Sequence, residues 1–443
     1  MSLKNSDNFL SKSEITRREA LIAGAAATSI LAAAIQGTDA ADVIDKAVGP
    51  ILGHVDHETA IVWYRPVSPG EYLATLTHTK TGNVVSAKAH ASPDHDLCIR
   101  WRFDNLQADS EYTYAISYQG RTIADSNTQQ IKTSPPINKP ARTVLGMGSC
   151  ASSSKFFDVW TQIAANNIDG LMLLGDTPYI DNRELSVNRM RHREFLSIPT
   201  LNEMGASTPI WGTWDDHDFG GNDTDGKISN KEIIRQAFCE YRAQKEFGDG
   251  KHGVYTKFRR GPVEVFMIDP RYFSQSEPSP VDPEKPTCLG KTQWNWLRDG
   301  LKQSTAPFKL LATGMIWDDK KNGEKDDWET YAHEREALFD FIGQNKIGGV
   351  VLIGGDIHVS RHLKYPPKDR IGYDRHQFII SPLHDSVIPS LNVPHPHLQW
   401  GEPLKNMFLT VAVDTTGDRP ILDANWIDRT GKLHREVRIE LNG

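Results

Sequence analysis

The sequence predicts an α/β protein in which a small all-β domain precedes a larger domain of alternating strands and helices. Three observations support this fold class. Short β-rich runs separated by turn residues fill residues 46–134, near-continuous apolar runs recur after residue 142, and segments with helical spacing lie between those later runs. With 443 residues, 38% of them hydrophobic, the chain is long enough for two domains with sizeable cores.

Composition and charge exclude several classes of protein. The hydrophobic content argues against a disordered chain, and the formal net charge of −7 argues against a nucleic-acid-binding protein with a basic surface. The four cysteines are too few for a disulfide-built scaffold. None of them forms a Cys-x-x-Cys pair, so zinc fingers and thioredoxin-like motifs are not indicated.

Residues 1–40 are predicted to be an export signal of the bacterial twin-arginine type. Arg17 and Arg18 precede an uncharged stretch at 20–37, rich in Ala and Gly, and small residues at 38–40 form a plausible cleavage point. A single transmembrane anchor is the alternative, but the stretch is weakly apolar and shorter than the roughly 20 residues that a span needs. We therefore expect a periplasmic or secreted protein without a membrane span after signal removal, exported by the twin-arginine machinery.

Residues 46–134 are predicted to form a β-sandwich of the fibronectin III type. Their short strands at regular spacing are typical of such domains, and Leu106 followed by Tyr112 resembles the tyrosine corner found there. A Pro-rich stretch at 135–141 predicts a stiff linker before a second domain at 142–443. The histidines of the first domain are expected on its surface: His54, His57, His78, His90 and His95.

In the second domain, each apolar run of strand length ends in a cluster of polar residues. The runs are 143–147, 170–174, 209–213, 263–268 and 349–353. Such runs are typical of a sheet buried on both faces, and helical spacing at 156–163, 233–241, 294–301 and 338–342 predicts the helices that cover it. Because ligands bind outside the carboxyl ends of the strands in such folds, we expect the polar clusters to meet at one edge of the sheet.

The pooled polar residues favour a metal centre. They are Cys150, Asp176, Tyr179, Asp215, Asp216, His217, Asn222, Asp356 and His358. Carboxylate, imidazole and amide groups suit a divalent or trivalent ion, whereas a thiolate and a phenolate favour iron or another transition metal. Two metals bridged by a carboxylate could polarise a phosphoryl oxygen and generate a hydroxide nucleophile near neutral pH. Each motif alone also has a plain structural interpretation, as a turn, a buried thiol or a helix N-cap.

The order of these motifs resembles the PhoD-type alkaline phosphatases of the metallophosphoesterase superfamily. The motifs are Gly-Ser-Cys, Gly-Asp-x-x-Tyr, Trp-Asp-Asp-His-Asp with Gly-Asn-Asp, Asp-x-Arg and Gly-Asp-x-His. The resemblance covers residues 142–415. It implies a metallophosphoesterase-like two-sheet sandwich flanked by helices, and hydrolysis of phosphomonoesters and phosphodiesters with ferric iron (Fe3+) and calcium (Ca2+).

The resemblance also implies metal-binding roles for individual residues. Cys150, Tyr179 and His358 look like iron ligands, and Asp176 looks like the carboxylate that bridges the two metals. The calcium ligands implied by the family are Asn222 and Asp356.

The remaining roles implied by the resemblance concern catalysis. His217 and Arg271 look like groups that support the metal ligands or contact the phosphate, and the guanidinium fork of Arg271 suits a phosphoryl group. Asp216 is a further catalytic candidate. Ser149 stands where some members have an Asp, which leaves the calcium side one carboxylate short.

These observations favour an exported metal-dependent phosphoric ester hydrolase that acts on small phosphate esters. One alternative is a phospholipase-like phosphodiesterase. Another is a non-catalytic surface-binding protein with a degenerate phosphatase domain, although the intact motifs at Asp176 and His358 argue against it. The segment 384–400, with His384, His395 and His397, either lines the mouth of the site or forms a Pro-rich surface loop.

The export prediction can be tested directly. Replacing both Arg17 and Arg18 with Lys is expected to trap the protein in the cytoplasm, because the transport machinery reads the arginine pair. Cell fractionation and immunoblotting measure the distribution, with the unchanged sequence as the control. Normal amounts of the double variant outside the cytoplasm would show that residues 1–40 have been misinterpreted.

Overall fold

The structure is a computed structural model, and the residues that it describes begin at residue 46. The predicted export signal at 1–40 lies outside the described residues. The described ranges are 46–125, 129–152, 158–318, 320–367 and 370–441. Residues 47–443 form one compact unit. Within the described ranges, no helix is both long and apolar enough to cross a membrane.

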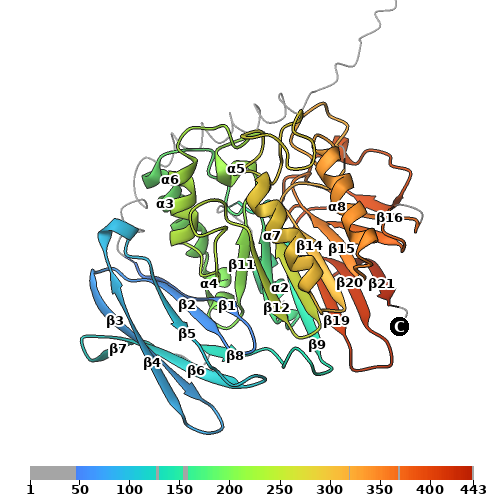
Figure 1. The fold of residues 1–443 in the computed structure, drawn as a ribbon. Helices are drawn as coiled ribbons and strands as arrows, with labels where there is room; N and C mark the ends of the chain where they lie inside the picture. The colour runs from blue at the N-terminus through green and yellow to red at the C-terminus, as the bar shows by residue number, and fades with distance from the viewer. Residues whose placement is uncertain (1–45, 126–128, 153–157, 319, 368–369, 442–443) are drawn as a thin grey trace, which may run out of the picture. The chain divides into compact units, whose positions relative to one another are not determined.

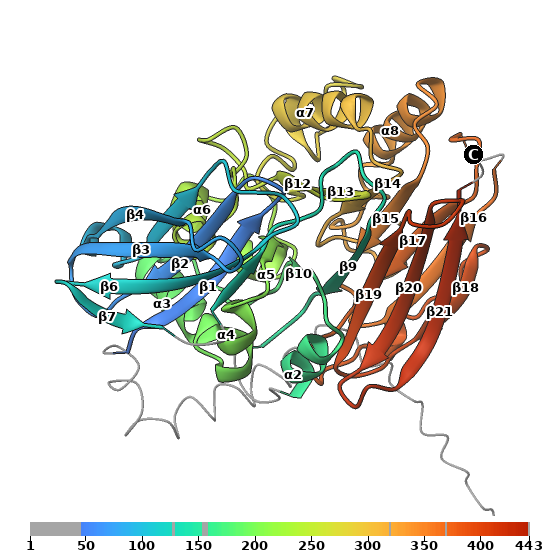
Figure 2. The same cartoon turned by 90° about the horizontal axis from the view of Figure 1, so that it is seen from below.

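The first strands form a β-sandwich, as predicted (Figure 2). One sheet has the order β1 (Val48–Val55), β2 (Ala60–Arg65), β5 (Ile99–Phe103), and the other has the order β4 (Val84–Ala91), β3 (Gly70–His78), β6 (Glu111–Tyr118), β7 (Arg121–Ala124), with β8 (Gln130–Lys132) also paired to β6. Buried side chains such as Trp101 and Tyr114 fill the space between the sheets. The Tyr112 hydroxyl accepts a hydrogen bond from the Gln107 N–H at 2.8 Å, as a tyrosine corner requires a link to the preceding backbone.

The expectation that the histidines of this domain lie on the surface is wrong for His54 and His78, which are both buried. His54 Nε2 lies 2.8 Å from the Asp56 carboxylate, and its Nδ1 accepts a hydrogen bond from the Trp211 indole at 3.4 Å. The His78 ring packs edge-on against Tyr112. Both nitrogens of His54 have polar partners, whereas His78 accepts hydrogen bonds from the Lys80 and Thr81 N–H groups through Nδ1 alone.

Two larger sheets carry the rest of the fold. The β9 sheet has the order β11 (Ile210–Thr213), β10 (Gly170–Leu174), β9 (Arg142–Gly148), β19 (Met407–Asp414), β20 (Ile421–Asp428), β21 (Leu433–Glu440). The β15 sheet has the order β12 (Thr256–Arg260), β13 (Val263–Met267), β14 (Phe308–Ala312), β15 (Val350–Gly354), β17 (Arg375–Ile379), β16 (Ser360–Tyr365), β18 (Leu398–Glu402). Strands β9, β10 and β11 run parallel, as do β13, β14, β15 and β17.

The two sheets enclose a common apolar core. Side chains such as Leu145 and Met172 from the β9 sheet contact Leu310 and Ile353 from the β15 sheet, all of them fully buried. The central strands β10, β13, β14 and β15 are buried along their whole length, whereas the outer strands β18 and β21 are largely exposed or half-buried. This arrangement confirms the predicted sandwich of two sheets.

Helices cover the outer faces of this sandwich (Figure 1). Those of the β9 side are α2 (Asp158–Ala165), α3 (Leu185–Leu196) and α4 (Pro199–Gly205). The short helix α5 (Asp216–Phe219) and α6 (Lys231–Glu240) share a separate apolar cluster, and α6 packs against α3. Those of the β15 side are α7 (Gly290–Gln303) and α8 (Ala332–Gln344). Helices α2, α6, α7 and α8 occupy the four segments predicted from helical spacing, although Phe156 and Phe157 of the first lie outside the described residues.

Candidate metal centre

The carboxyl ends of parallel strands from both sheets meet at one place. Cys150 follows β9 and Asp176 follows β10, and these two segments are joined by a hydrogen bond from the Cys150 N–H to the Gly175 carbonyl at 3.2 Å. Asp356 and His358 follow β15 of the facing sheet. The predicted convergence of polar clusters therefore involves the edges of two sheets.

Two glycines allow these edges to approach closely. A Cβ atom added at Gly175 would lie 2.6 Å from the Asp215 Cβ, and one added at Gly314, after β14, would also lie 2.6 Å from it. Gly175 in addition has a φ of +94°, which a side chain disfavours. Any larger residue at either position would push Asp215 out of the centre.

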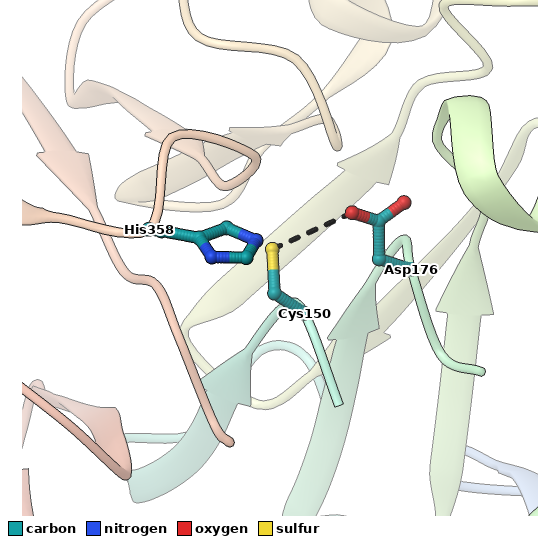
Figure 3. Close-up of side chains that lie close together, drawn as sticks. All are labelled: Cys150, Asp176 and His358. Carbon is teal, nitrogen blue, oxygen red and sulfur yellow. Dashed lines mark hydrogen bonds between the residues drawn. The ribbon is translucent and has the colours of Figure 1, made fainter. Parts of the chain in front are cut away.

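Cys150, Asp176 and His358 form a compact group of potential ligands (Figure 3). One ligand atom from each lies within 4.8 Å of the others, and all three residues are buried. The Cys150 thiol lies 3.5 Å from the Asp176 carboxylate and accepts a hydrogen bond from the Ser381 hydroxyl at 3.1 Å. A thiolate, a carboxylate and an imidazole at this spacing can hold one transition-metal ion.

Tyr179 and His384 extend this group. The Tyr179 hydroxyl lies 2.7 Å from His358 Nε2, and the Tyr179 ring stacks on the ring of His384, with centroids 5.3 Å apart. The sequence left the place of His384 open, and the structure puts this ring against both Tyr179 and His358. Burial lowers the pKa of His384 to about 4, so its imidazole is neutral near pH 7.

Carboxylates dominate the other half of the centre. Within the described residues, further groups of potential ligands are Asp176, Asp216 and His217; Asp215, Asp216 and Asp356; and Asp216, Asp223 and Asp326. Asp216 is common to these groups because it opens helix α5, where its oxygens accept hydrogen bonds from the N–H groups of His217 and Asp223. Asn222, predicted as a calcium ligand, is exposed in the loop beside Asp223.

His217 faces the carboxylates from helix α5. Its Nδ1 lies 2.6 Å from the Asp181 carboxylate, and its ring packs against Tyr179. Burial alone would lower the pKa of His217, but the negative charges of Asp216, Asp176 and Asp181 raise it to about 10. The His217 side chain is therefore an imidazolium cation at neutral pH.

Arg271 and Ser149 both make hydrogen bonds with other parts of the protein. Arg271 is fully buried, and its guanidinium pairs with Asp215, with Nε 2.6 Å from Oδ1. This contact favours the predicted supporting role over contact with a phosphate. The Ser149 hydroxyl donates to the Ile380 carbonyl at 2.8 Å, so this side chain links the β9 sheet to the segment that follows β17.

Sequence reasoning missed Asp181, Lys320 and Asp326. Asp326 belongs to one of the carboxylate groups, and the Lys320 ammonium lies 2.6 Å from both Asp326 and Asp356. A signal for the last two was present, because the apolar run of β14 is followed by the polar segment 318–327 in the same way as the recognised strands. Lys309 interrupts that run and hid it.

The backbone of the centre is strained. Cys150, Asp176, Asp356 and His358 all have a positive φ, between 52° and 67°. For residues other than glycine this conformation costs of order 1 kcal/mol or more each, and it clusters at functional sites. Four such residues at one place indicate that the fold holds these side chains in position at the expense of stability.

The buried acidic groups of the centre would be stabilised in their ionised form by an added cation. Burial and the negative charge of Asp216 raise the pKa of Asp176 well above its ordinary value, and burial and Asp176 raise the pKa of the Cys150 thiol. Because ligands must be deprotonated to bind a metal, a bound cation would favour the ionised forms of these groups. The donor set therefore fits a metal ion both in geometry and in charge.

Comparison with known proteins gives the same picture of sequence and fold. A model of the PhoD-like phosphatase family matches residues 145–398. Alkaline phosphatase D of Bacillus subtilis (strain 168) is 25% identical over 322 residues, which cover 61% of this chain and 54% of that protein. The matching region thus spans about half the length of this relative.

Two solved structures have the same fold. A structure of PhoD superposes with a TM-score of 0.72 and 18% identity, covering 89% of this chain and 92% of the other. The purple acid phosphatase PPD1 from yellow lupin (Lupinus luteus) seeds superposes with a TM-score of 0.66 and 11% identity, covering 89% and 74%. The metallophosphoesterase-like fold preceded by a β-sandwich is therefore confirmed.

Removing one buried carboxylate is expected to change stability in opposite directions with and without metal. An ionised carboxyl whose pKa is raised on folding destabilises the fold above its unfolded pKa, so Asp176→Asn in a chelator at pH 8 should raise the unfolding temperature by about 2 °C. With metal bound, the same substitution removes a ligand and should lower the unfolding temperature. Differential scanning calorimetry measures both, with Asp418→Asn on the surface as the control. A shift of the same sign in both conditions would contradict a metal at Asp176.

Proposed function

The chain belongs to the PhoD-like phosphatase family, and from this premise we propose that it is an exported, metal-dependent hydrolase of phosphoric esters. The observation that carries the proposal is the buried group of Cys150, Asp176 and His358 beside a cluster of carboxylates. Such a donor set has no structural need in a fold that already has an apolar core, and it is strained and short of positive charge.

In this proposal the two halves of the centre bind different ions. Cys150, Tyr179 and His358 hold Fe3+, because two anionic soft or phenolic ligands stabilise a trivalent ion. Asp176 belongs to ligand groups in both halves. Asp356 and Asn222, the latter from the exposed loop beside Asp223, contribute oxygen ligands for Ca2+, which tolerates irregular geometry. When bound, the ions supply Lewis-acid stabilisation of a phosphoryl oxygen and lower the pKa of water.

The side chains of this chain then perform the remaining tasks. His217, kept protonated by the carboxylates around it, can donate a hydrogen bond or a proton to an oxygen of the ester, and Asp181 fixes its ring. Arg271 positions Asp215, which caps helix α5 and so sets the place of Asp216. Both are positioning contacts, because neither Arg271 nor Asp215 is exposed.

The proposed activity is tested with a chromogenic phosphate monoester and a bis-substituted diester. Asp176→Ala should lower the rate by at least roughly a thousandfold, because it removes several kcal/mol of metal-based stabilisation at about 1.4 kcal/mol per decade. His217→Ala should cost about 10²- to 10⁴-fold. Asp418→Ala, on the surface, serves as the control. No turnover of either ester by the metal-loaded wild type, or more than about a tenth of wild-type activity in Asp176→Ala, would contradict the proposal.

The proposed iron gives a spectroscopic prediction that does not depend on the substrate. Protein purified without added metal should contain about one iron per chain and absorb visible light, because thiolate and phenolate transfer charge to ferric iron. Absorption spectra should shift or weaken in Cys150→Ser and in Tyr179→Phe, but not in Cys288→Ser, a buried thiol outside the centre. Two zinc ions in a colourless active protein would overturn the assignment of iron.

A further inference from the structure

Lys320 is a buried ammonium inside the carboxylate half of the centre. It lies in the segment that follows β14, and its side chain has no exposed surface. The Nζ atom is 2.6 Å from Asp326 Oδ1 and 2.6 Å from Asp356 Oδ2, with Glu324 at 3.6 Å. A lysine is almost never fully buried unless it is paired, so these carboxylates are the reason that it can lie here.

The two short distances have the geometry of a bridged cation. Both N···O distances are those of short charge-assisted hydrogen bonds, so one ammonium is shared by one oxygen of each carboxylate. Asp356 is also a member of a potential metal-ligand group with Asp215 and Asp216. Asp326 belongs to another such group, with Asp216 and Asp223. The ammonium thus lies between members of two neighbouring groups of potential ligands that share Asp216.

A line of alternating charges connects this ammonium to the rest of the centre. Asp215 pairs with Arg271, Arg271 NH2 lies 3.6 Å from Asp326, and Asp326 pairs with Lys320. Each of these side chains is buried, so each charge is compensated mainly by its neighbours in the line. The chain itself therefore supplies two fixed cations to an edge that is rich in carboxylates.

We propose that the Lys320 ammonium takes the place of one divalent cation, holding Asp326 and Asp356 together so that this half of the centre binds one metal ion fewer than its carboxylates would otherwise hold. The inference rests on the proposed metal-dependent function. Lys320 is a positioning residue, because its buried side chain has no exposed surface from which to reach a substrate. A neutral side chain at this position would leave two carboxylates facing each other with no cation of the chain between them.

The test counts metal ions and needs no substrate. Lys320→Met keeps the length of the side chain and removes its charge, so the variant is expected to bind about one Ca2+ per chain more than the wild type, measured by isothermal titration calorimetry and elemental analysis. Lys320→Arg keeps the charge and should bind the wild-type number. Lys325→Met removes the same charge from an exposed position of the same segment and is the matched control. Equal Ca2+ numbers in the wild type and Lys320→Met would overturn the inference.

A second measurement uses the wild type alone, so it holds even if Lys320→Met fails to fold. Crystals grown with Mn2+ in place of Ca2+ would locate the ions by anomalous scattering. We expect the Lys320 ammonium between Asp326 and Asp356, whereas a metal ion bound to both carboxylates with the lysine displaced would overturn the inference. Failure of the wild type to hydrolyse esters, together with an extra Ca2+ in Lys320→Met, would refute the proposed function and leave this inference standing.

Discussion

Carboxylates buried together at the ends of two sheets are the constraint on which the rest of this centre depends. Asp176, Asp215, Asp216, Asp326 and Asp356 lie close together and are almost fully buried. Like charges in such a place cannot all ionise unless cations compensate them. The excess of negative charge accounts for the other features of the centre. These are the buried basic side chains, the raised pKa values and the ligand spacing suited to a metal.

The fold meets the constraint through its parallel strands. Because β9 and β10 in one sheet and β14 and β15 in the other are largely buried, most of their polar residues lie near the strand ends, and the potential ligands follow the carboxyl ends. Positive φ at Asp176 and Asp356 turns these side chains inward, and Gly175 and Gly314 leave room for Asp215 between the sheets. The stability lost to this strain is recovered in the large shared core.

The sequence alone was sufficient for the fold class, the predicted strands of the two sheets and most of the side chains that converge, because apolar runs and turn residues are local signals. It was insufficient where partners come from distant segments. The run of β14 was missed because Lys309 interrupts it, although that ammonium donates hydrogen bonds to the carbonyl groups of Ala306 and Gly348 at the start of the strand. His54 was misjudged for the same reason, since only tertiary contact with Trp211 explains its burial.

The two kinds of cation in this centre differ in what controls them. A metal ion equilibrates with its surroundings, so its occupancy follows concentration and pH. Arg271 and Lys320 are present in every folded molecule, and they compensate Asp215, Asp326 and Asp356 whether or not a metal is available. Fixed cations in one half of the centre therefore allow the chain to fold with its carboxylates in place, while Cys150 and His358 in the other half stay available as potential metal ligands.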